Sequence, residues 1–270
     1  MSRMIALGRR GLLAAGMALP FAARVQAAPC QLAAEQEVGP FYLSDESLRA
    51  DITEDRTGLP LELRLQVLDS RSCRPLAAAA VDLWHCDAMG LYSGFTQMAA
   101  VGPPSSGRPP AGPPPGGLPR GGPPPGGPPG GPPPVGRPTD KLTFLRGVQR
   151  TDAEGLVRFR TIFPGVYPGR TNHIHFKVHV AQHVAHVGQI FFPEDLALSI
   201  MQRAPYDGHR IRRTAQLEDG VFRGQGGTSS IAAVRMDGQG SVAVADLAVA
   251  VDPMATPAPV GMGPVGIGRP

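Results

Sequence analysis

Features that would point to a membrane or to nucleic acid are scarce in this sequence. Beyond residue 27 no apolar run is long enough to cross a bilayer, and the run at residues 11–23 is too short for a stable spanning helix. Excess positive charge is also confined to the start of the chain. Residues 1–27 hold four arginines and no acid, so their removal cancels the formal charge of +4. The sequence therefore predicts neither a membrane span nor a nucleic-acid surface.

Cysteine is scarce as well, with only Cys30, Cys73 and Cys86 in the chain. Three cysteines allow three different pairs with one residue left over, and the sequence does not choose among them. Cys86 lies on a predicted strand and is equally compatible with a buried free thiol. We do not count it as a metal ligand.

The first 27 residues have the pattern of an export signal. Arg9-Arg10-Gly-Leu-Leu resembles a twin-arginine signal, and Val25-Gln-Ala27 is a small-residue cleavage site, which predicts a mature chain from Ala28. A general secretory signal is the alternative interpretation. Either one predicts an exported protein, periplasmic or extracellular, where a disulfide is allowed.

Alternating apolar and polar residues predict an all-β domain, a two-sheet β-sandwich with few short helices. We place this domain at residues 28–225, followed by a terminal strand segment at 226–251 and a disordered tail at 252–270. A helix is expected at residues 194–202. The expected strands of the domain cover residues 61–68, 79–84, 155–160, 174–180 and 189–192.

A low-complexity insertion interrupts the domain at residues 101–138. Gly and Pro supply 29 of its 38 residues without a strict Gly-x-y period, so a collagen helix is excluded and disorder is expected. The insertion is compatible with a lid or tether, or with a tolerated loop expansion without a role of its own.

The most informative stretch runs from Tyr167 to Phe176, where Pro168 and Gly169 predict a turn before a strand. The strand period of two places His173 and His175 on one face, where two imidazoles can share a cation. Such a pair by itself is also compatible with two ordinary half-buried histidines.

Two tyrosines make a metal more plausible. Tyr167 precedes the histidine pair, and Tyr92 follows a predicted strand and a glycine turn. A free phenol has a pKa near 10 and becomes a phenolate ligand only beside a strongly Lewis-acidic cation, which ferric iron is. Zinc favours Cys, His and carboxylate, and Fe(II) oxygenases use two His with a carboxylate, so this set argues against both. Tyr92 could instead be a strand-end aromatic packed on Trp84.

Together these residues resemble the intradiol ring-cleavage dioxygenases, which cleave catechols at non-haem ferric iron. In that family a Trp lies eight residues before the first ligand tyrosine, as Trp84 lies before Tyr92 here, and the second tyrosine opens a Tyr-Pro turn, as Tyr167 does. The likeness covers roughly residues 35 to 225 apart from the insertion, and includes Gly-Pro-Phe-Tyr at residues 39–42.

The family also has an Arg three residues before its first ligand histidine, within Arg-Pro-Ala-His-x-His, and a Gln fourteen residues after the second. Arg170 and Gln189 match these positions, whereas Thr171 and Asn172 depart from the motif. The resemblance thus reaches beyond the metal ligands to the groups expected to contact substrate.

The resemblance implies that Fe(III) is held by four side chains and that a catechol-type substrate reacts with O2 to give a muconate-type dicarboxylic acid. Tyr167 is expected to leave the metal when the substrate binds, Arg170 to stabilise the developing ring anion, and Gln189 to orient the substrate. The implied ligands are Tyr92, Tyr167, His173 and His175.

Two other interpretations stay open from the sequence. One is a non-catalytic β-sandwich module for binding or for the cell envelope, and the other is an enzyme with a different metal, such as copper or zinc, at His173 and His175. The intact pair of tyrosines argues against the first.

Overall fold

The computed structural model describes residues 30–44, 47–99 and 137–257. The predicted signal at 1–27 lies outside these residues, as do nearly all of the insertion at 101–138 and most of the tail at 252–270. Among the described residues, no helix has both the length and the apolar character needed to cross a membrane.

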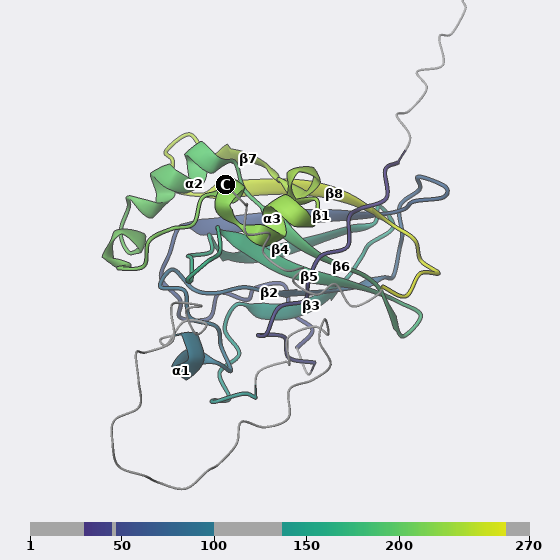
Figure 1. Cartoon of the computed structure of the whole chain (residues 1–270). Coiled ribbons are helices and arrows are strands. Elements are labelled where there is room, and N and C mark those ends of the chain that lie inside the picture. Colours follow the sequence, from purple (N-terminus) through teal and green to yellow (C-terminus); the bar gives the residue numbers. More distant parts are fainter. Residues whose placement is uncertain (1–29, 45–46, 100–136, 258–270) are drawn as a thin grey trace, which may run out of the picture.

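The described residues form two four-stranded sheets, which confirms the predicted all-β sandwich. Figure 1 shows β1 and β8 in an upper layer and β2 and β3 in a lower one. The first sheet has the order β4-β1-β8-β7 and the second has the order β3-β2-β5-β6. Their strands are β1 Pro60–Asp69, β2 Ala80–Trp84, β3 Arg146–Arg150, β4 Leu156–Ile162, β5 His173–Val180, β6 His183–Phe191, β7 Ala233–Met236 and β8 Ala243–Val251.

The helices are short. Near the second sheet lies α1 Thr96–Ala99, and the others follow β6 in the chain: α2 Glu194–Met201, η1 Tyr206–Gly208, η2 Gln216–Glu218, α3 Gly220–Gly224 and η3 Gly227–Ser230. The helix predicted at 194–202 corresponds to α2. The terminal segment predicted at 226–251 supplies β7 and β8, and β8 pairs in parallel with β1 in the interior of the first sheet.

The core lies between the sheets and follows from the alternation in β1. Leu61, Leu63, Leu65 and Val67 are all buried, while the residues between them are partly exposed. They pack in one cluster with residues from the second sheet, among them Val81, Leu83, Ile174, Phe176 and Val178. Burial of each such side chain contributes about 1.5–3 kcal/mol, so the alternation holds the two layers together.

The second sheet is also covered on its other face. Because Ile174 and Phe176 point into the core, the period of two sends His173 and His175 to the opposite side. There a separate aromatic cluster covers the sheet, made of Phe41, Trp84, Cys86, Tyr92, Phe95 and Tyr167. The candidate site therefore lies outside the sandwich core, beneath the loops that cover this face.

The structure shows which cysteines pair. Cys30 and Cys73 form a disulfide with their Cα atoms 5.6 Å apart, and Cys86 is a buried free thiol. The disulfide ties the first described residue of the chain to the turn after β1.

Candidate metal centre

The two histidines of β5 meet at their Nε2 atoms, which lie 3.0 Å apart. Both rings are almost fully buried, with 2% of His173 and 1% of His175 exposed. The two nitrogens are close enough together for one cation to contact both. The predicted strand alternation therefore brings two imidazoles to one point.

The tautomer of His173 is set by the main chain. Its Nδ1 lies 2.7 Å from the carbonyl oxygen of Thr171, and a carbonyl can only accept, so Nδ1 carries the proton and Nε2 carries a lone pair. Burial lowers the pKa of both His173 and His175 well below the usual value, which keeps the rings neutral. Neutral imidazole is the form that binds a metal.

His175 is fixed by stacking. The indole of Trp84 lies parallel to its ring, with centroids 5.0 Å apart and an angle of 6°. On another side Gly39 packs so closely that a Cβ there would lie 3.1 Å from Cε1 of His175, and its φ of +72° is also one that favours glycine. The Gly-Pro-Phe-Tyr segment and Trp84 therefore hold the ring in place.

Tyr92 reaches the centre from a tight turn after β2. Asp87 accepts hydrogen bonds from the N–H groups of Met89 and Leu91, both at 2.9 Å. Gly90 has a φ of +79°, and a Cβ there would lie 2.2 Å from the carbonyl oxygen of Val166, so this turn requires glycine. The turn places the Tyr92 ring 5.6 Å from the ring of Tyr167 and 6.3 Å from that of His175.

The two phenols differ in their partners. The hydroxyl of Tyr167 lies 3.4 Å from Nε2 of His173, whereas the hydroxyl of Tyr92 is buried and has no hydrogen-bond partner in the described part of the chain. Burial raises the pKa of Tyr167 to about 12 and that of Tyr92 well above 10. Both phenols therefore stay protonated unless a cation stabilises the phenolate.

Arg170 and Gln189 lie beside this group. Arg170 donates from Nη1 to the Tyr167 hydroxyl at 3.2 Å and from Nη2 to Oε1 of Gln189. Gln189 lies directly opposite His175 in the pairing of β5 with β6, which explains how it arrives there from fourteen residues away. The structure thus brings together all six residues singled out in the sequence, and their chemical roles remain predictions.

The donors present fit a ferric ion. The Nε2 atoms of two neutral imidazoles converge, and the buried Tyr92 hydroxyl nearby has no hydrogen-bond partner among the described residues. Burying a hydroxyl without a partner costs free energy unless a ligand binds it. The described residues contain no group of three or more His, Cys, Asp or Glu that could hold a metal. The set of two imidazoles and two phenols is therefore distinct from the usual zinc and Fe(II) sites.

Sequence reasoning missed the residues that hold Arg170. Asp219 is fully buried at the start of α3, and its Oδ2 accepts from Nε of Arg170 and from the N–H of Thr171, both at 2.9 Å. Glu37, before β1, approaches Arg170 to 3.9 Å. Neither carries a local motif, so no signal in the sequence indicates the contact.

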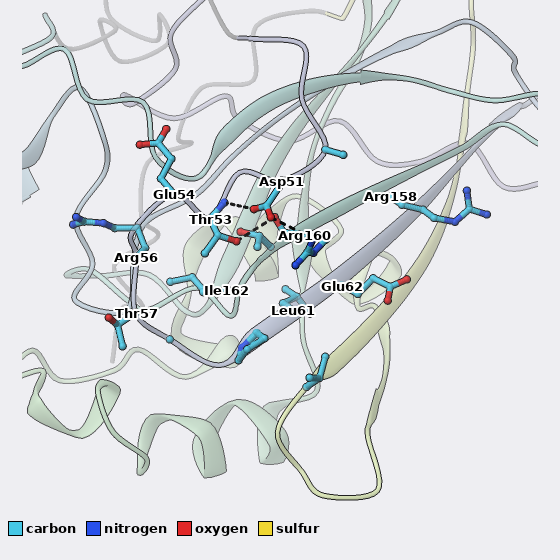
Figure 2. Close-up of a pocket in the computed structure, with 15 residues that line it drawn as sticks. Asp51, Thr53, Glu54, Arg56, Thr57, Leu61, Glu62, Arg158, Arg160 and Ile162 are labelled. Atoms are coloured by element: carbon cyan, nitrogen blue, oxygen red, sulfur yellow. Dashed lines mark hydrogen bonds and ion pairs between the residues drawn. The ribbon is translucent and has the colours of Figure 1, made fainter.

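A separate pocket lies over the first sheet (Figure 2) and has a volume of about 760 Å³. It contains none of the six candidate residues. Its arginines and acids partly offset each other, for example Arg160 with Asp51 at 3.6 Å, and both side chains are largely exposed. This pocket offers no convergent set of chemical groups comparable to the histidine-tyrosine centre.

Comparison with solved structures gives a close relative. An intradiol ring-cleavage dioxygenase from Tetranychus urticae is 33% identical, with a TM-score of 0.70, and the alignment covers 84% of this chain and 98% of that one. No protein-family model and no curated protein matches the sequence.

More distant structures share the fold. The dioxygenase domain of a dioxygenase carbohydrate-binding protein fusion from Streptomyces sp. SirexAA-E is 23% identical, with a TM-score of 0.50 over 82% of this chain and 99% of that one. Hydroxyquinol 1,2-dioxygenase from Pseudomonas putida DLL-E4 is 17% identical, with a TM-score of 0.51 over 83% of this chain and 68% of that one. With 33% identity to the Tetranychus enzyme across an alignment that covers nearly the whole of that protein, this chain belongs to the intradiol ring-cleavage dioxygenase family.

Proposed function

We propose that the protein cleaves a catechol-type aromatic ring between its two hydroxylated carbons, using O2 and a ferric ion held by Tyr92, Tyr167, His173 and His175. One oxygen atom enters each new carboxyl group, so the product is a muconate-type dicarboxylic acid. The strongest support is the convergence of two neutral imidazoles 3.0 Å apart with two buried phenols. When bound, the ferric ion would stabilise the phenolates and the catecholate dianion and so activate the ring towards O2.

Tyr167 accounts for one of the two proton movements. A catechol that binds as a dianion would lose both hydroxyl protons. We assign one of them to the phenolate oxygen of Tyr167, which would become a neutral phenol, and the other to a solvent hydroxide, which would become water. A free Tyr167 phenol holds that proton firmly, because burial raises its pKa to about 12.

Arg170 is placed to stabilise negative charge on the substrate. Its side chain is 11% exposed, and its Nη1 contacts the Tyr167 hydroxyl at 3.2 Å, so it borders the space that this hydroxyl would vacate. A guanidinium fixed there before reaction lowers the energy of a developing anion without rearrangement. Gln189 accepts from Arg170 and so holds its orientation.

The visible spectrum of iron-loaded mature protein tests this function. Tyrosinate bound to ferric iron should give a broad visible band that shifts on anaerobic addition of catechol, and Tyr92→Phe and Tyr167→Phe should each change it. Tyr206→Phe is a matched control, because Tyr206 is also buried but donates to the carbonyl oxygen of Phe163 at 2.8 Å instead.

The outcome separates the rival interpretations. A band together with oxygen uptake on catechol supports the dioxygenase. Colourless protein that binds zinc in place of iron would indicate another metal at His173 and His175, and protein that binds no metal would indicate a module without catalysis.

We also propose that the protein is exported through the signal predicted at residues 1–27. The disulfide between Cys30 and Cys73 supports this, because disulfides persist mainly in oxidising compartments. Mass spectrometry of the chain from periplasmic and external fractions should find an N-terminus at Ala28, and a chain that retains Met1 in the cytoplasm would contradict export.

A further inference from the structure

A segment ahead of β1 forms one wall of the candidate centre. Gly39 lies against the His175 ring, and the Phe41 ring stacks on Tyr92 with centroids 4.4 Å apart. Gln36 accepts from the main-chain N–H of Gln189, and the carbonyl oxygen of Glu37 accepts from Nε2 of the Gln189 side chain at 3.0 Å. Residues 36–41 therefore border the metal ligands and the groups expected to contact substrate.

Glu37 places a carboxylate in this wall. Only 5% of the residue is exposed, and its Oε1 lies 3.9 Å from Nη1 of Arg170. Its Oε2 is buried and has no hydrogen-bond partner among the described residues. A buried acceptor without a partner is costly and is uncommon in a structure that uses all of its groups internally. The unused oxygen points to a ligand as the missing neighbour.

The charges around Arg170 do not balance. Its Nε is already paired with the buried carboxylate of Asp219 at 2.9 Å, so Glu37 is the second acid beside one guanidinium. The pKa of Glu37 is raised, first by burial and also by the neighbouring charge of Asp219, while Arg170 and Gln225 act in the opposite direction. Two other arginines of this region are also engaged: Arg146 donates to the carbonyl oxygens of Phe41 and Ser93, and Arg213 is paired with Glu194 at 2.7 Å.

The exposed fractions indicate the side from which a ring would enter. Tyr92 is 0% exposed and the two histidines 1–2%, whereas Arg170, Tyr167 and Glu37 retain 9%, 8% and 5%. Tyr92 and the two histidines are thus the deepest part of the centre, and the outer part contains Tyr167, Arg170 and the Glu37 carboxylate. A substituent on the far side of the bound ring would lie near these outer groups.

We propose that Glu37 is a specificity-determining residue through which this site selects uncharged catechols over catechols that carry a carboxylate on the ring. The inference rests on the ring-cleavage function proposed above. With two acids beside Arg170, no positive charge is left over to bind a substrate carboxylate. Repulsion between like charges a few ångströms apart is strong where water is largely excluded.

The test compares catechol with 3,4-dihydroxybenzoate, which differs by a ring carboxylate. Binding to iron-loaded protein is measured by calorimetry without oxygen, and kcat/KM is measured by oxygen uptake. Wild-type protein should bind and cleave catechol at least about tenfold better than 3,4-dihydroxybenzoate. Glu37→Gln should reduce that preference by about tenfold, mainly by raising the affinity and kcat/KM for 3,4-dihydroxybenzoate. The variant removes one negative charge and keeps the shape of the side chain.

Glu35→Gln is the matched control. Glu35 belongs to the same segment, but its carboxylate binds Nδ1 of His186 at 2.7 Å and the N–H of Val187 at 3.0 Å, away from Arg170. This variant makes the same change in net charge and should leave the preference unaltered. Glu37→Met is a second variant in case the amide is poorly accommodated, since an apolar side chain of similar length needs no hydrogen bond.

The outcomes are distinct. Equal binding of the two diols by wild-type protein, or an unchanged preference in folded Glu37→Gln and Glu37→Met, would overturn the role of Glu37 while leaving ring cleavage intact. Failure of iron-loaded wild-type protein to bind or cleave either diol would overturn the proposed function together with this inference.

Discussion

Asp219 and Arg170 are 49 residues apart in the chain, yet Oδ2 of Asp219 accepts a hydrogen bond from Nε of Arg170 at 2.9 Å. The other oxygen of the same carboxylate accepts from the N–H groups of Val221 and Phe222 at the start of α3. One buried carboxylate therefore holds both a short helix and the guanidinium of the candidate site.

Asp219→Asn should lower both stability and activity. The amide can still cap α3 through its oxygen, but its NH2 group would face the Nε–H of Arg170 and leave a buried charge without its partner. We expect the free energy of unfolding to fall by about 3 kcal/mol, and kcat to fall because Arg170 loses its fixed orientation. Urea unfolding and oxygen uptake measure the two effects.

Asp252→Asn is the control for that comparison. Asp252 pairs with Arg71 at 2.8 Å, but Arg71 is largely exposed, so this variant should lower the free energy of unfolding much less than Asp219→Asn does. Equal losses in the two variants would contradict the role given to Asp219.

The disulfide should contribute measurably to stability. It closes a loop between positions 43 residues apart. Because the cross-link lowers the conformational entropy of the unfolded chain, we expect a loss of about 4 kcal/mol when Cys30 and Cys73 are both replaced by Ser. Urea titrations with and without a reducing agent provide the measurement. Cys86→Ala should remain as sensitive to the reducing agent as wild type, and a reducing agent without effect on wild-type protein would refute the prediction.

Asp140 joins the two ends of the insertion. Its carboxylate accepts from the N–H groups of Gly94 at 2.8 Å and Thr96 at 3.0 Å, and from the Thr96 hydroxyl at 2.8 Å. Thr139 adds a hydrogen bond from its N–H to the carbonyl oxygen of Gly94 at 2.7 Å. The chain is thus closed just after Tyr92, before residues 100–136 begin.

Replacement of residues 100–136 by a short Gly/Ser linker should therefore not lower the unfolding free energy, because a shorter flexible loop costs less entropy to close. Asp140→Ala in the full-length chain should cost about 2 kcal/mol through lost hydrogen bonds. Thermal and urea unfolding of both variants give the comparison. A deletion as costly as Asp140→Ala would mean that the insertion itself supports the fold.

His85 should make the protein sensitive to acid. It is fully buried between the carbonyl oxygen of Cys86 at 2.8 Å and the Thr161 hydroxyl at 2.7 Å, and burial lowers its pKa to about 4. Between about pH 6.5 and 4 this histidine is protonated in the unfolded chain but not in the folded protein. Lowering the pH from 6.5 to 4 should therefore reduce the free energy of unfolding by about 3 kcal/mol in total.

His85→Gln tests this linkage. The variant should be less stable at pH 7 but show a shallower decline between pH 6.5 and 4 in urea unfolding of metal-free protein. Some slope should remain, because the pKa values of His173 and His175 are also lowered by burial. An unchanged slope would indicate that His85 does not contribute.

Local sequence patterns were sufficient to predict strands that have one buried face. The alternation in β1 and β5 predicts both strands and the shared face of His173 and His175, because the period of two is a property of the strand itself. The beginning of β6 was missed, since His183 and His186 obscure its alternation and its pairing with β5 shifts between Val178 and His179.

Contacts between distant segments could not be predicted in the same way. Glu37 and Asp219 reach Arg170 from opposite ends of the domain, and nothing near either residue in the sequence marks it as a partner of an arginine. The pairing of Cys30 with Cys73 rather than Cys86 likewise depends on where the turn after β1 meets the start of the domain.

The place of β8 in the first sheet sets an order for folding during synthesis. Every strand of the second sheet, which positions the histidines, is made by Phe191, whereas β1 lacks its parallel partner until residues 243–251 have left the ribosome. Until then one edge of β1 is open to pairing with other chains. A chain interrupted before β8 would therefore contain the residues of the candidate centre on a sandwich prone to aggregate.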